Sequence, residues 1–240
     1  MTDSTTESGI FTTVNLVRSS HPWTEVDSAA GFVLRYLIPM RRQLIDILGS
    51  PTHADRSLKI LLGHLVSSGF GEHKQGRLRD YLLRAVRSAA KATAAELPEA
   101  ERPELKLDDV RIDSRRWLAY WREGLLQRAW RSLERFEHAN DDAPVYAILS
   151  AATADPKLTA EMLAVAVQNS SDTAPNDAAP IDAAPIDAAA VTRLLPVAKT
   201  MFAQFIADEV AETLQTPDRE AVSREITALG LGKAFEGVQY

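Results

Sequence analysis

SRRWLAYWREGLLQRAWRSLERF, residues 114–136, is the stretch that decides the fold. Its period matches the 3.6-residue turn of an α-helix, so the stretch predicts a long amphipathic helix with one buried side. No segment of the chain shows the two-residue alternation of a β-strand, so the sequence predicts an all-α fold. We expect its tryptophans to be core residues rather than a stacking platform for bases. The apolar positions recur every three or four residues, at Trp117, Trp121, Leu125, Ala129, Leu133 and Phe136.

Toward the N-terminus, residues 24–49 carry a capping-box spacing at their start and Gly49 at their end. Pro39 should split this segment near Leu37, because proline removes a backbone donor and clashes with the preceding turn. The segment therefore predicts two short helices.

A further helix is predicted in residues 53–69, because leucines occur there at helical spacing. Residues 76–91 predict the next helix, after a glycine-containing loop. Residues 92–109 carry two prolines and six carboxylates without an apolar period, which indicates a linker. The leucines of the first helix are Leu58, Leu61, Leu62 and Leu65.

Toward the C-terminus, the stretch SSDTAPNDAAPIDAAPIDAAA contains AAPID twice in succession. Its proline, alanine and aspartate composition does not build a packed core, so residues 170–187 are predicted to be disordered. Helices are expected around this insertion, one of them broken or kinked at Pro196. Their expected ranges are 144–152, 159–168, 188–214 and 218–229.

Together these elements predict two small helical domains joined by a linker. The first domain covers residues 1–92, the linker covers 93–112, and the second domain covers 113–240.

Charge is unevenly distributed along this chain of net charge −6. Residues 35–136 hold 20 Lys or Arg against 13 Asp or Glu, an excess of +7, whereas residues 150–240 hold 6 against 13, an excess of −7. The halves face different partners, or only one of them faces a polyanion. A contact between the two halves is a further hypothesis. The absence of cysteine excludes disulfides and thiolate sites. With no run of about 18 apolar residues, we expect a cytoplasmic protein without a membrane partner.

The segment GRLRDYLLRAVRSAAK, residues 76–91, concentrates positive charge. On a helical wheel its cations Arg77, Arg84, Arg87 and Lys91 fall within an arc of roughly 80°, beside an apolar arc. Such a stripe suits phosphate contacts. It also suits an ordinary solvated helix face, and composition alone favours that second interpretation.

Signals for catalysis or metal binding are missing from the sequence. None of the five histidines are four residues apart, and HExxH, GxSxG and a phosphate-binding Gly-Lys-Ser/Thr loop are absent. We therefore expect no metal site, and the residues offer catalysis no starting point.

Read in order, these segments resemble the extracytoplasmic-function sigma factors of bacterial RNA polymerase. GRLRDYLLRAVRS is similar to the family's GxFRxWLxxIxxN segment, FTTVNLVRSS to its opening, and VLRYLIPMRRQLIDILG to its first helix pair. RRWLAYWREGLLQRAWRSL is similar to the helix that opens the second domain. The resemblance implies that the second domain is a modified helix-turn-helix with the low-complexity insertion at about 170–187. It also implies a transcription initiation protein, without a cofactor or enzymatic activity of its own, that binds RNA polymerase core and promoter DNA, mainly through the first domain.

The resemblance also implies roles for individual residues. The basic helix would contact phosphates and an unstacked base, while the preceding leucine helix would bind the polymerase. The implied DNA-binding residues are Arg77, Arg79, Tyr81, Arg84, Arg87 and Lys91. The implied polymerase-binding residues are Leu58, Leu61, Leu62 and Leu65.

The chain departs from the family's pattern at two places. Arg56, Ser57, Leu58 and Lys59 stand where the family's polymerase-binding segment reads near Asp-Leu-x-Gln. The low-complexity insertion stands where the family has a short turn. Residues 190–214 resemble the family's recognition helix, but they hold Pro196, and between residues 191 and 206 their only cations are Arg193 and Lys199. The alternative hypothesis is therefore a sigma-derived protein-interaction module that has lost promoter recognition and binds polymerase or a regulatory protein.

Overall fold

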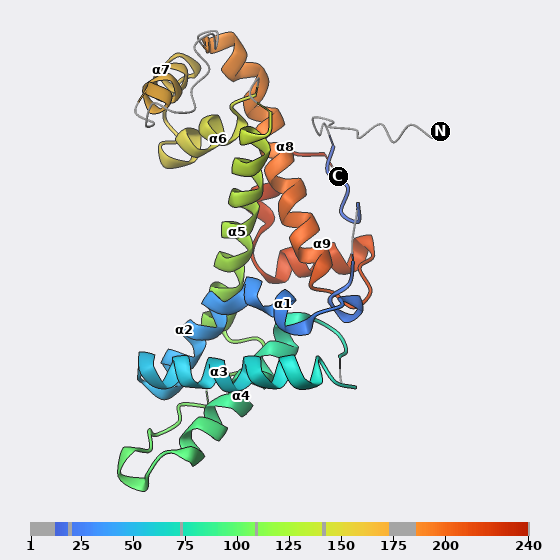
Figure 1. Cartoon of the computed structure of the whole chain (residues 1–240). Coiled ribbons are helices and arrows are strands. Elements are labelled where there is room, and N and C mark those ends of the chain that lie inside the picture. Colours follow the sequence, from blue (N-terminus) through green and yellow to red (C-terminus); the bar gives the residue numbers. More distant parts are fainter. Residues whose placement is uncertain are drawn as a thin grey trace. The chain divides into compact units, whose positions relative to one another are not determined.

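Every regular element in the described part of the chain is helical, which confirms the predicted all-α class. The structure is a computed structural model and describes residues 13–18, 21–72, 74–108, 110–140, 143–172 and 186–239 (Figure 1). The extended pairing within these ranges is an isolated antiparallel bridge between Arg77 and Leu214.

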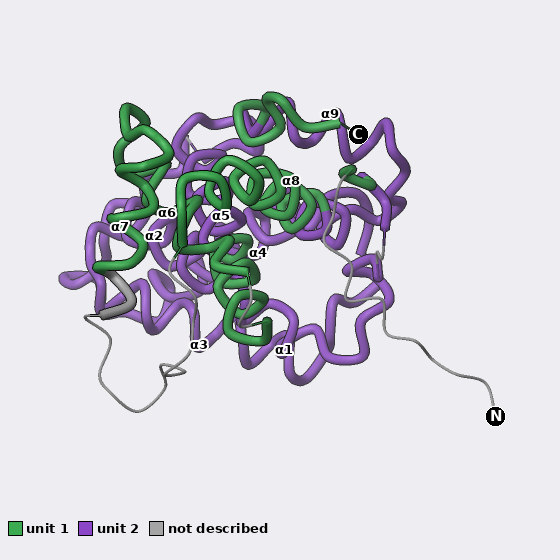
Figure 2. The backbone as a smooth tube through the Cα atoms, turned by 90° about the horizontal axis from the view of Figure 1, so that it is seen from above, with its two compact units in different colours: residues 1–15, 128–207, 232–240 green, residues 16–127, 208–231 purple. Residues whose placement is uncertain are grey.

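The chain folds into two packing units, and each is assembled from separate stretches of sequence (Figure 2). Unit 1 contains residues 1–15, 128–207 and 232–240, and unit 2 contains residues 16–127 and 208–231. This division differs from the predicted domains 1–92 and 113–240, because part of the C-terminal region packs with the N-terminal region in unit 2. The boundary also falls inside two helices rather than in the predicted linker 93–112.

Unit 2 begins with short helical turns that lead into three longer helices. Ser28 caps α1 by accepting a hydrogen bond from the Gly31 amide, and Ser50 caps α3 in the same way. Gly49, at φ 66°, lets the chain reverse between α2 and α3. The elements are η1 (Trp23–Glu25), α1 (Ala29–Val33), η2 (Leu34–Tyr36), α2 (Leu37–Leu48), α3 (Pro51–Ser68), α4 (Leu78–Glu96) and η3 (Glu99–Glu101).

These bounds agree with the predicted helices except at one end. The break before Leu37 is where Pro39 was expected to produce it, because the proline stands in the first turn of α2. Helix α4, however, continues to Glu96 into the predicted linker. Residues 92–96 are mostly alanine, which favours helix and needs no apolar period to extend one.

The core of unit 2 forms around the long helix α5 (Arg115–His138), whose first part belongs to this unit. Trp117 and Trp121 are fully buried there, as predicted, and Tyr36 stacks on Trp121 with ring centroids 4.7 Å apart. The unit is completed by the end of α8 (Ala188–Glu212) and by α9 (Arg219–Ala228), which Asp218 caps. The other core side chains of this unit include Val33, Met40, Leu44, Ile47, Leu78, Leu82, Val86 and Leu125.

Unit 1 combines the end of α5 with α6 (Val145–Ala154), α7 (Ala160–Asp172), most of α8 and η4 (Gly232–Phe235). Its core joins the three helices α6, α7 and α8, and Trp130 of α5 packs against Tyr146 and Phe202. The core residues shared by these helices are Ile148, Leu163, Ala164, Val167, Val191 and Leu194.

Two predictions for this region need correction. Of the break or kink expected at Pro196, the break is absent, because Pro196 lies inside the continuous helix α8. The predicted disordered segment 170–187 was drawn too widely, because residues 170–172 are helical and Asp187 caps α8 by accepting a hydrogen bond from the Ala190 amide. Residues 173–185 lie outside the described ranges. The 15 residues between α7 and α8 are longer than a helix-turn-helix turn, so the predicted motif is not confirmed.

Candidate docking groove

Helices α3 and α4 of unit 2 lie side by side and run in opposite directions (Figure 1). Near the start of α3, the Ser57 hydroxyl forms a buried hydrogen bond of 2.5 Å with the Thr93 hydroxyl near the end of α4. The Arg56 guanidinium donates to the Glu96 carboxylate at the same end, at 2.9 Å from Nη2. These contacts fix the spacing of the two helices at one end.

At the opposite end, three aromatic rings hold the helices. Trp23 packs edge-on against Phe70 with centroids 4.9 Å apart, and Tyr81 contacts both rings at 5.3 Å. The Tyr81 hydroxyl donates to the Phe70 carbonyl at 3.2 Å, and the Trp23 indole donates to the Gly76 carbonyl at 3.1 Å. Burial raises the pKa of Tyr81 above its ordinary value, so the ring stays neutral.

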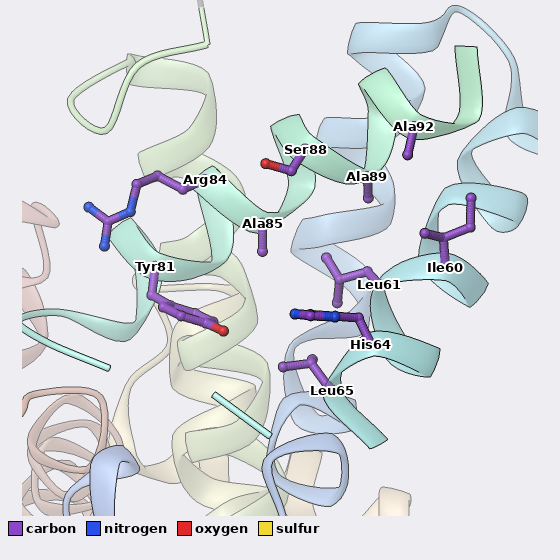
Figure 3. A pocket seen from close by; sticks show the side chains of 10 residues that line it. All are labelled: Ile60, Leu61, His64, Leu65, Tyr81, Arg84, Ala85, Ser88, Ala89 and Ala92. Atoms are coloured by element: carbon purple, nitrogen blue, oxygen red, sulfur yellow. The ribbon is translucent and has the colours of Figure 1, made fainter. Parts of the chain in front are cut away.

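Between these two ends lies an open groove with a volume of about 430 Å³. Figure 3 shows the small side chains of α4 facing α3, with Arg84 extending from α4 beside Tyr81. The floor is buried and apolar, whereas His64, Arg84 and Ser88 are exposed at the rim. The lining residues are Ile60, Leu61, His64, Leu65, Tyr81, Arg84, Ala85, Ser88, Ala89 and Ala92. No carboxylate is among these lining residues.

The groove is lined by residues from two sets to which the family resemblance implied different roles. Leu61 and Leu65 come from the set implied to bind polymerase, and Tyr81 and Arg84 come from the set implied to bind DNA. The sequence analysis missed His64, Ser88 and the alanines of α4, because small and neutral residues carry no functional signal alone. Their spacing of three and four residues on α4 was the available clue.

Of the leucines implied to bind polymerase, most belong to the core. Leu58, Leu61 and Leu65 are buried, and Leu62 is half-buried. Leu61 and Leu65 contribute to the groove floor, while Leu58 does not line it. Two of the four implied leucines, Leu61 and Leu65, therefore line a recess that α3 shares with α4.

Arg79, implied to contact DNA, is only 3% exposed and donates four hydrogen bonds inside the protein. Its Nε donates to Glu225 of α9 at 2.5 Å, and Nη2 donates to the same carboxylate at 3.2 Å. Its Nη1 donates to the Ile112 carbonyl and to Asp80. With four of its five N–H donors engaged inside the protein and the side chain buried, this guanidinium is not available to a phosphate.

The other cations of the basic helix divide into two groups. Arg77 is half-buried and pairs with Asp80 at 2.8 Å and with Glu225 at 3.4 Å, and Arg87 donates to the Val110 carbonyl at 2.7 Å. Arg84 and Lys91 are exposed and have no ion pair among the described residues. The predicted stripe therefore offers two open cations.

Carboxylates of residues 208–231 engage further arginines of unit 2. Arg35 bonds Glu212 at 2.6 Å and Glu209 at 3.1 Å, and Arg18 bonds Asp208 at 2.6 Å. Backbone contacts support the same attachment, because the Leu78 amide donates to the Thr213 carbonyl at 2.8 Å. Part of the +7 and −7 asymmetry is thus neutralised inside this unit.

A second hollow, which is polar, adjoins the start of α4. Its lining residues are Gln75, Gly76, Arg77, Asp80, Arg84 and Gln215. Arg84 lines both hollows, so its guanidinium lies where the apolar groove meets polar surface.

In the described ranges, no three His, Asp or Glu side chains are grouped to hold a metal ion. Among the helices of the same ranges, none has the length and apolar character needed to cross a lipid bilayer. No protein-family model, curated protein or solved structure matches the chain.

Proposed function

We propose that the chain is a non-enzymatic, cytoplasmic protein-interaction module, sigma-like in its order of helices, that binds its partner at the groove between α3 and α4. The groove is the observation that carries this proposal. It is fixed at one end by the Ser57–Thr93 bond and at the other by the Trp23, Phe70 and Tyr81 rings. A preformed recess loses little conformational freedom on binding, which favours affinity.

The proposed partner is RNA polymerase core, and a regulatory protein is the alternative partner. Support comes from the sequence resemblance and from the two implied polymerase leucines, Leu61 and Leu65, that line the groove floor. The module function is preferred to promoter recognition because Arg77, Arg79 and Arg87 are engaged within the protein.

Promoter binding is the second candidate function, and one observation favours it. Arg84 and Lys91 are exposed on the same helix, about 10 Å apart along its axis, and remain free to contact phosphates. Two cations neutralise few phosphates, so this binding would be weak and sensitive to salt.

The test is a pull-down of purified RNA polymerase core by the intact protein. We expect retention by the wild type and its loss from Ser88→Trp, because an indole at this exposed lining position fills the groove. The matched control is Val66→Trp, which adds the same ring at a position that is 75% exposed and outside the groove.

Failure of the wild type to retain polymerase would contradict the polymerase proposal, and equal retention by Ser88→Trp would contradict the groove as its site. Promoter DNA added at low salt distinguishes the second function. DNA that is retained by the wild type and released from the Arg84→Ala, Lys91→Ala double variant supports promoter contact.

A further inference from the structure

We infer that the occupant of the groove is an amphipathic α-helix with an apolar stripe and an acidic residue that pairs with Arg84. This inference rests on the proposed protein-binding function and deepens it by stating the chemistry of the partner. It depends on three features of the groove: its shape, its small-residue wall and its charge.

The shape of the groove suits a helix. Its α4 wall runs from Tyr81 to Ala92, which corresponds to about 16 Å or three helical turns. A partner helix of the same length presents apolar side chains at positions i, i+3 or i+4, and i+7 along one side. The groove is open along this length, between the Ser57–Thr93 hydrogen bond and the Tyr81–Phe70 hydrogen bond.

The wall formed by α4 allows close approach. Ala85, Ala89 and Ala92 present only methyl groups, and helices pack at axial separations of 8–10 Å that depend on the side chains in between. The opposite wall supplies Ile60, Leu61 and Leu65, which are large apolar groups for a partner's leucines to contact. One wall therefore gives space and the other gives apolar contact area.

The charge around the groove selects an acidic partner. Arg84 is a rim cation without an ion pair among the described residues, and Lys91 is a second open cation on the same helix. No carboxylate lines the groove, and Asp80 in the adjoining hollow is already paired with Arg77 and Arg79. An acidic residue at the end of the partner's stripe therefore meets a net attraction near Arg84. A lysine at that position would face Arg84 at close range.

The experiment uses the full chain and three labelled helix-forming peptides of about four turns. The first has leucines at i, i+3 and i+7, glutamines on its other sides and a glutamate at each end of the leucine stripe. The second replaces both glutamates with lysine, and the third replaces the leucines with glutamine. Fluorescence anisotropy gives the dissociation constant for each.

We expect the glutamate peptide to bind the wild type more tightly than the lysine peptide, by at least about threefold, and the peptide without leucines not to bind. Arg84→Glu should reverse the preference between the two charged peptides. Arg115→Glu makes the same charge change at an exposed position of unit 2 outside the groove, and should leave the preference unchanged.

Ser88→Trp should weaken binding of the glutamate peptide by about tenfold or more, and Val66→Trp should not. Circular dichroism verifies that each variant remains folded. Equal binding of the glutamate peptide to the wild type and Ser88→Trp overturns the inference, as does an absence of peptide binding or an unchanged preference in Arg84→Glu. If polymerase retention persists in that case, the partner chemistry is wrong and the proposed function stands; loss of retention by the wild type overturns the function itself.

Discussion

At the scale of single residues, Arg79 shows how far a side chain's role depends on distant sequence. The resemblance to sigma factors implied that Arg79 contacts DNA, which requires an exposed guanidinium. Its partner Glu225 lies 146 positions later, and both side chains are buried. A buried arginine needs its carboxylate, since an unpaired charge in the interior is strongly destabilising.

Replacing Arg79 tests whether its role is structural. Arg79→Ala should lower the free energy of unfolding by about 3 kcal/mol, because the buried Glu225 carboxylate then keeps only the longer 3.4 Å contact with Arg77. The double variant Arg79→Met, Glu225→Leu should recover part of that loss. Urea unfolding measures both, and Arg84→Met serves as the exposed control, with an expected change within about 0.5 kcal/mol.

An Arg79→Ala protein as stable as the control would contradict the structural role. It would return Arg79 to the group of surface cations available for phosphate contact.

At the scale of elements, helix limits are set by caps and by packing as well as by periodicity. The positions of glycines and prolines predicted the ends of α2, α3 and α4, except that α4 extends further than expected. Helix α8 continues through Pro196 although proline costs about 3 kcal/mol in a helix interior. Val191, Leu194, Ala198 and Met201 are buried on both sides of the exposed proline, so tertiary packing offsets that cost.

Local sequence also gave no indication of the cap of α6. The Glu137 carboxylate, on α5, accepts hydrogen bonds from the Tyr146 and Ala147 amides at 2.6 and 3.0 Å. These amides are free donors at the start of α6, where Pro144 supplies no side-chain cap. The cap lies eight residues before the helix, outside the positions at which cap residues are normally sought.

Glu137 also predicts a dependence of stability on pH. Burial raises the pKa of Glu137 above its ordinary value of 4.5, although the two amide hydrogen bonds oppose this. The contribution of Glu137 is therefore fully present below its unfolded pKa and is lost as the pH rises through the folded pKa. Because glutamine cannot ionise, the stability of Glu137→Gln relative to the wild type should increase as the pH rises through the folded pKa of Glu137.

Urea unfolding at a series of pH values from about 4 to 7 measures this difference. Glu137→Ala is the control for the cap, and should be less stable than Glu137→Gln by about 1 kcal/mol, because it leaves both amides without their acceptor. A stability difference between wild type and Glu137→Gln that does not change with pH would contradict the assigned pKa shift.

At the scale of the whole molecule, the uneven distribution of charge along the chain is partly explained by ion pairs within unit 2. The +7 and −7 halves were compatible with an external polyanion or with an internal contact. In unit 2, acidic residues of 208–231 bond Arg18, Arg35, Arg77 and Arg79, so internal pairing accounts for part of the asymmetry. The sequence predicts that opposite charges exist but not their pairing, because residues far apart in a chain leave no periodic signal. The groove could not be predicted from the sequence for the same reason, because it forms only where α3 and α4 meet.

This arrangement predicts that unit 2 depends on its C-terminal segment. A chain that ends at residue 207 loses Val210, Leu214, Val222 and Ile226 from the core, and each buried side chain of this size contributes about 1.5–3 kcal/mol. Since the total stability of a domain is about 5–15 kcal/mol, unit 2 should lose its cooperative unfolding transition. Its tryptophans Trp117 and Trp121 should then lose their near-ultraviolet circular dichroism. A chain that ends at residue 231 is the matched control, because it keeps all of unit 2 and should retain both signals. If the shorter chain unfolded at the same urea concentration as this control, the N-terminal region would be an independent domain, as the linear boundary near residues 93–112 implies.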